Sequence, residues 1–193
     1  MDPWPTLGLR EAQTILKPRM PLLAACLRES LDSFNDIPPL IPIAFTPATK
    51  WACLNDLWYS SAEAKFSETA GVSFGAHKPQ RYLNIGERCL LRYKHFDKAM
   101  FARNYPTRHN RDWLRQGHLM GLPPAVRLEL GYRLDGTGIR FQDAFITLPF
   151  AASHQWVWQI WGAQIETFAI PRPLFADSNN ELLFAYDDYS QTG

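Results

Sequence analysis

Basic residues, which bind phosphate groups, and aromatic residues, which stack on bases, are concentrated between Leu91 and His118. The segment contains seven Lys or Arg residues and two Asp residues, a local net charge of +5 in a chain whose formal net charge is +1. Guanidinium and ammonium groups neutralise phosphates, and aromatic rings stack on unpaired bases. Both types alternate along this segment, so we predict that it forms a binding surface.

The predicted contacts of this surface combine cationic groups with aromatic side chains. Arg108, Arg111 and Arg115 are spaced i, i+3 and i+7, so a helix beginning as early as Arg108 would place them on one face. Tyr105 and Trp113 are the candidate stacking or anchoring residues. The full set of predicted binding residues is Arg92, Lys94, Arg103, Tyr105, Arg108, Arg111, Trp113 and Arg115.

Two kinds of partner suit these cations. The leading hypothesis is a small non-enzymatic protein that binds nucleic acid. The alternative is a protein-interaction module, such as an inhibitor, an antitoxin-like partner or an adaptor, that binds an acidic protein surface. A further alternative is that the segment is a solvated face or a groove that holds the chain's own C-terminal end, which has four acidic residues and no Lys or Arg from Leu174 onward.

A third hypothesis is a divergent metal-dependent nuclease that uses Glu129 and Asp143. Carboxylates on neighbouring strands can hold Mg²⁺ for phosphodiester cleavage. The familiar arrangement of this kind includes a Glu-x-Lys sequence, which is absent between Ala125 and Trp161. Pairing of these carboxylates with arginines of the same strands, such as Arg133, is the more ordinary expectation.

Sequence motifs for cofactors and metals are missing. The chain has no Walker A loop, no Gly-x-Gly-x-x-Gly, no His-x-x-x-His and no Cys-x-x-Cys. We therefore predict no metal site and no cofactor, and a binding protein is expected rather than an enzyme.

The stretch from Ala125 to Trp161 predicts a three-stranded antiparallel meander. Apolar residues alternate with charged residues and glycine from Arg127 to Leu134, as in a strand with one buried face. The sequence Asp135-Gly-Thr-Gly138 favours a turn, and Pro149 is expected to end the second strand. The third strand is predicted around Trp156–Trp161.

The remaining elements are predicted from caps and spacing. A helix interrupted at Pro18 and Pro21 is expected between Leu9 and Asn35, and a second begins at Thr46-Pro47. Further expectations are a loop at 71–79, a hairpin at 81–96 that turns at Gly86-Glu87, short helices at 97–103 and 110–118, and a strand near 165–170. The predicted fold is α+β, with N-terminal helices packed on an antiparallel sheet built from the hairpin and the meander.

Length and composition indicate one domain over residues 1–193. It comprises a helical part (9–70), a sheet part (81–170) and an acidic C-terminal segment (174–193). The N-terminus lacks a signal-peptide pattern, no apolar run approaches the ~20 residues that span a bilayer, and the three cysteines are widely separated. We therefore expect a cytoplasmic protein that does not bind membranes.

Overall fold

The helices lie mainly in the N-terminal part of the chain. The computed structural model describes residues 6–38, 45–77, 80–102, 107–116, 122–162 and 167–169. The helices are α1 (Leu9–Leu16), the 3-10 turn η1 (Lys17–Arg19), α2 (Met20–Asn35), α4 (Pro47–Phe66) and α5 (Arg108–Leu114). None of them is long and apolar enough to cross a membrane.

Local sequence signals explain where these helices begin. The helical run predicted from Leu9 to Asn35 is interrupted by η1, which contains Pro18, and Pro21 stands in the first turn of α2. Both positions suit proline, whose missing N–H is tolerated near the start of a helix. The Thr46 hydroxyl accepts a hydrogen bond from the backbone N–H of Thr49 at 3.2 Å, which confirms the predicted cap of α4.

One mixed sheet contains all the described strands, and its strand order follows the chain. The strands are β1 (Val72–His77), β2 (Gln80–Ile85), β3 (Cys89–His95), β4 (Val126–Leu134), β5 (Phe141–Phe150), β6 (Ser153–Trp161) and β7 (Thr167–Ala169). The predicted hairpin and meander are present as β2–β3 and β4–β5–β6. The prediction of a purely antiparallel sheet is wrong, because β3 and β4 pair in parallel.

Three local predictions also need correction. Residues 72–77 form strand β1 rather than a loop. The segment after Phe96 is a tight turn instead of a helix, because the Asp97 carboxylate accepts hydrogen bonds from the N–H groups of Ala99 and Phe101. Strand β5 continues through Pro149 to Phe150, and a register irregularity before Pro149 accommodates the missing donor.

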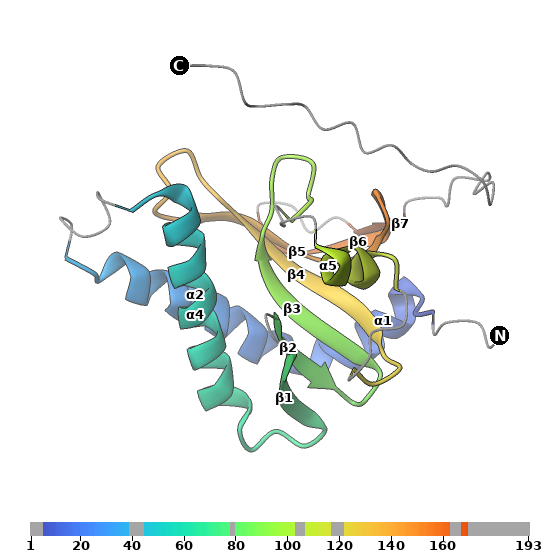
Figure 1. Ribbon diagram of the computed structural model, residues 1–193. Coiled ribbons are helices and arrows are strands. Elements are labelled where there is room, and N and C mark those ends of the chain that lie inside the picture. Colours follow the sequence, from blue (N-terminus) through green and yellow to red (C-terminus); the bar gives the residue numbers. More distant parts are fainter. Residues whose placement is uncertain are drawn as a thin grey trace.

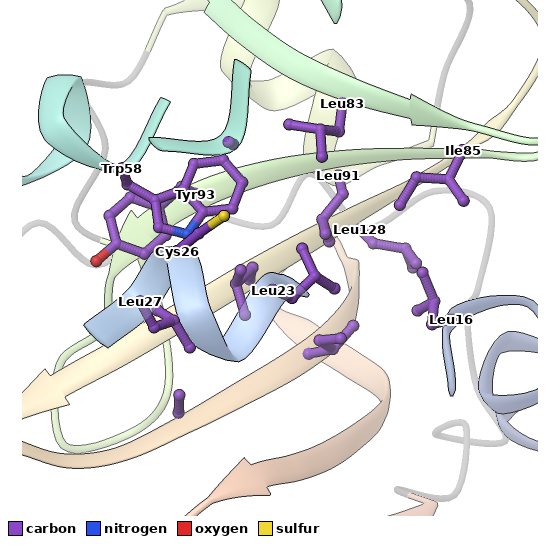
Figure 2. Close-up of a cluster of buried hydrophobic side chains, with 14 of the residues drawn as sticks. Leu16, Leu23, Cys26, Leu27, Trp58, Leu83, Ile85, Leu91, Tyr93 and Leu128 are labelled. Atoms are coloured by element: carbon purple, nitrogen blue, oxygen red, sulfur yellow. The ribbon is translucent and has the colours of Figure 1, made fainter. Parts of the chain in front are cut away.

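The main hydrophobic core lies between the N-terminal helices and one face of the sheet. In Figure 2, Leu23, Cys26 and Leu27 of α2 point toward the leucines of β3 and β4, with Trp58 and Tyr93 beside them. The rings of Trp58 and Tyr93 are stacked with centroids 4.8 Å apart, and Tyr93 stacks in turn on Tyr132 at 4.8 Å. This aromatic stack joins α4 to the two parallel strands.

The sheet divides between β2 and β3. These strands pair only from Leu83 to Ile85, whereas β1 and β2 pair along their whole length. Side chains of α4 bond to the backbone in the gap: Asn55 donates to the Tyr93 carbonyl at 3.0 Å, and the Tyr59 hydroxyl donates to the Arg81 carbonyl. In Figure 1, β1 and β2 turn away from β3 as a separate ribbon.

Strand β4 approaches the Phe96 ring so closely that one position has no room for a side chain. A Cβ atom on Gly131 would lie 2.0 Å from the ring of Phe96, which is itself buried. We expect Gly131→Ala to lower the free energy of unfolding by about 1–3 kcal/mol, the usual cost of overpacking.

Urea denaturation of this variant, compared with Gly136→Ala, tests that expectation. A Cβ atom added at Gly136 would meet only open space, so this substitution should change stability little. Equal stabilities for the two variants would show that the Phe96 ring moves aside freely.

Candidate functional site

The helix α5 crosses the sheet face opposite the main core and carries the predicted row of arginines. It begins at Arg108, because the Thr107 hydroxyl accepts a hydrogen bond from the backbone N–H of Asn110 at 3.2 Å. Arg108 and Arg111 are exposed on the helix, and Arg115 is exposed at its C-cap. In Figure 1, α5 lies in front of β4, while α2 passes behind the sheet.

Among the described residues, these arginines form one ion pair, which is weak and exposed. The Arg108 side chain is 91% exposed and its Nε lies 3.8 Å from an Asp112 carboxylate oxygen. Exposed pairs of this kind contribute about 0–1 kcal/mol. The described part of the chain therefore leaves the row accessible to an anionic partner.

Trp113 anchors α5 to the sheet. Its ring is completely buried, and the guanidinium carbons of Arg92 and Arg127 lie 4.7 Å and 5.9 Å from the ring centroid. Cations over an indole face are attracted by its quadrupole, most strongly where water is excluded. This contact fixes the inner side of α5 and directs the arginine row outward.

Gln116 ties the end of α5 to the backbone of β4. Its side-chain oxygen accepts from the Arg127 N–H at 2.9 Å, and its amide donates to the carbonyls of Arg127 (2.8 Å) and Pro149 (3.2 Å). The Ala151 N–H donates to the Leu114 carbonyl at 3.0 Å. The helix is thereby attached to two neighbouring strands.

A buried ion pair lies beneath α5. The Arg92 guanidinium donates two hydrogen bonds to one carboxylate oxygen of Glu129, and its Nη1 donates to the Asn110 side-chain oxygen at 2.8 Å. The side chains of Arg92 and Glu129 are each 1% exposed. Their positions follow from the register of β3 and β4, in which these residues are direct partners.

Burial lowers the pKa of two other basic side chains near this pair. Desolvation lowers the pKa of Arg127 to about 10, with Asp112 opposing the shift. Desolvation also lowers the pKa of Lys94 to about 8; Arg92 adds to this effect and Glu129 opposes it. Perturbed cations of this kind are concentrated at functional sites.

The described residues of the predicted binding set thus occupy three different environments. Arg108, Arg111 and Arg115 are on the surface, while Arg92 and Trp113 are enclosed between α5 and the sheet. Lys94 is half-buried beside a cavity. Arg103 and Tyr105 lie outside the described residues.

The two carboxylates of the nuclease hypothesis are far apart. Glu129 is opposite Thr147, whereas Asp143 is opposite Arg133, so the acids are separated by four residues along β5, roughly 13 Å. Asp143 also pairs with the Arg133 guanidinium. Within the described part of the chain no group of three His, Cys, Asp or Glu residues could hold a metal ion.

A Gly-x-Ser-x-Gly sequence is present at Gly71–Gly75. Ser73 lies within the extended strand β1, paired opposite Asn84. A hydrolase nucleophile of this pattern stands on a sharp turn between a strand and a helix. The structure therefore does not support Ser73 as a nucleophile.

Comparison of the chain with protein-family models, with curated proteins and with solved structures finds no match. A functional assignment therefore depends on the contacts and charges of the site itself.

Asn110 and Gln116 complete the site, yet sequence inspection did not identify them. Both are buried polar residues within the segment already marked by its charge. The available signal was their position next to an apolar helical face, where a polar side chain needs a hydrogen-bonding partner.

The ion pair beneath α5 can be tested by substituting its members singly and together. Arg92→Met leaves a buried carboxylate without a partner, which typically costs about 3–5 kcal/mol. Adding Glu129→Leu should restore much of that loss. Urea unfolding of both variants measures the difference.

The matched control is Arg81→Met, which breaks an Arg81–Asp56 pair whose side chains are 48% and 65% exposed. Its cost should be at most about 1 kcal/mol. An Arg92→Met variant as stable as this control would contradict the importance of the buried pair.

The lowered pKa of Lys94 predicts a pH dependence of stability. Between about pH 8 and pH 10.5 the unfolded chain keeps the Lys94 proton while the native state releases it. The contribution of Lys94 to the free energy of unfolding therefore rises with pH across this interval.

We expect the stability of the wild type relative to Lys94→Met to increase from pH 8 to pH 10.5 in urea denaturation series. Cysteines and tyrosines titrate in both proteins, so their effect on stability cancels in this difference. A constant difference would show that the Lys94 ammonium is as well solvated in the native state as in the unfolded state.

Proposed function

We propose that this chain is a small non-enzymatic nucleic-acid-binding protein whose α5 arginine row contacts the phosphate backbone. The observation that carries the proposal is the exposure of Arg108, Arg111 and Arg115 together on a helix that Trp113 holds against the sheet. Because the helix is already fixed on the sheet, binding orders the arginine side chains but not their backbone, which favours affinity.

The spacing of the row suits a nucleic-acid duplex. Arg108 and Arg115 are separated by roughly 10 Å along a helix axis, and a duplex carries about one negative charge per 1.7 Å of its axis. Several phosphates therefore lie within reach of three arginines. Because the Trp113 ring faces inward, α5 offers no stacking platform, and we expect backbone contacts with little sequence preference.

The inward position of Trp113 also favours a second candidate function. Without a stacking ring beside them, the arginines suit carboxylates as well as phosphates, since a guanidinium binds either group through two parallel hydrogen bonds. An acidic protein surface is the partner in this case, as for an inhibitor or adaptor.

Fluorescence anisotropy with double-stranded and single-stranded DNA and RNA at about 50 and 200 mM salt tests the first function. Replacing Arg108, Arg111 and Arg115 together by Gln should weaken binding strongly. The slope of log affinity against log salt should fall by about 0.9 for each duplex phosphate contact that is lost.

The control variant replaces Arg10, Lys17 and Arg140 by Gln. It removes the same charge from exposed positions outside α5 and should retain most of the affinity. Equal losses in the two triple variants would indicate attraction by net charge alone and would overturn the proposed interface.

Absence of binding to every nucleic acid would instead favour the protein partner. A partner captured by the wild type and by the control variant, but lost with the α5 triple variant, would support that function.

A further inference from the structure

The division of the sheet between β2 and β3 opens a cavity of about 170 Å³. A water molecule needs roughly 10–15 Å³ of such space, so the cavity has room for a small organic molecule but not for a polymer. Polar and charged side chains dominate its lining. The lining residues are Asn55, Asp56, Tyr59, Arg81, Arg92, Tyr93 and Lys94.

Several of these side chains are already committed to structural contacts. The Tyr59 hydroxyl and the Asn55 amide hydrogen bond to the backbone across the gap. Arg92 is bonded to Glu129 and Asn110. They hold the walls of the cavity in place and have limited capacity for a ligand.

The charge at the rim is balanced. Arg81 pairs with Asp56 at 2.7 Å, and its guanidinium carbon lies 5.5 Å from the centroid of the Tyr59 ring. Ring and carboxylate together keep Arg81 at the mouth of the cavity.

Lys94 is the cation whose charge is not balanced. No carboxylate of the described residues lies within 4 Å of its ammonium group, whereas Arg81 and Arg92 each have such a partner. Lys94 nevertheless stays largely protonated at neutral pH, because its lowered pKa is still about 8. A desolvated ammonium without a counter-ion is costly in a protein, and an anion beside it would offset that cost.

We propose that this cavity binds a small anion through a phosphate or carboxylate group held by Lys94, with Arg81 at the entrance. The ligand is distinct from the partner of the α5 arginine row, and neither proposal depends on the other. Arg92 connects the two regions physically, since it lines the cavity and its guanidinium carbon lies over the Trp113 ring of α5.

Inorganic phosphate and succinate are suitable probes, because they separate a phosphate ligand from a carboxylate ligand. In calorimetric titrations of the full chain, at least one of them should bind at millimolar or lower concentration. Lys94→Met should weaken that binding by at least about tenfold, the effect of losing a hydrogen bond to a charged group in a buried site.

Two control variants accompany Lys94→Met. Lys17→Met removes an exposed ammonium from η1 and should leave binding unchanged. The triple Gln variant of α5 should also bind the anion as the wild type does. Unchanged affinity after Lys94→Met, or an equal loss after Lys17→Met, would overturn the proposal.

A second measurement uses the wild type alone and remains informative if Lys94→Met fails to fold. A bound anion should protect Lys94 from acylation by acetic anhydride, measured by mass spectrometry, relative to potassium chloride at equal ionic strength. Lys17 should be acylated equally in both salts. No protection by either anion, together with no heat of binding, would exclude the site.

Discussion

The parallel pairing of β3 with β4 is the constraint on which the rest of this structure depends. Parallel neighbours cannot be joined by a tight turn, so the chain must travel back along the sheet between them. The segment from Phe96 to Ala125 makes this connection and brings α5 over the second sheet face. The most basic part of the sequence is therefore also the part that the topology forces across the sheet.

The same pairing makes the face under α5 unusually polar. Arg92 and Glu129 become direct neighbours and are then covered by the helix, with Trp113 above them. A buried pair of this kind adds little net stability compared with apolar residues, but it strongly disfavours arrangements that separate its members. In the observed register of β3 on β4 the two residues are direct partners, so a shift of this register would separate their charges.

Much of the fold followed from local sequence signals. Alternation located the strands of the meander, the turn at Gly86-Glu87 located the β2–β3 hairpin, and Thr46 and Pro21 marked the beginnings of helices. Alternation does not report strand direction, which is why the parallel pair was missed. It also suggested that the charged face of β4 meets solvent, whereas α5 covers Arg127 and Glu129.

The candidate site was only partly predictable, for a related reason. Local charge density located α5 and its exposed arginines, because that property belongs to a short segment. The cavity beside Lys94 joins residues of α4, β2 and β3 that are distant in sequence. Its existence depends on where two strands stop pairing, which a single sequence does not encode in any local pattern.

The divided sheet has a consequence for how the molecule opens. The ribbon of β1 and β2 is joined to β3 by three residue pairs, from Leu83 to Ile85, and by the Tyr59 hydroxyl, which donates to the Arg81 carbonyl and accepts from the Tyr93 N–H at 3.4 Å. Segments with few attachments exchange their amide protons through local opening, without unfolding of the whole domain. We therefore expect the ribbon to exchange its amide protons before the rest of the sheet, and Arg81 of the Lys94 cavity belongs to this ribbon.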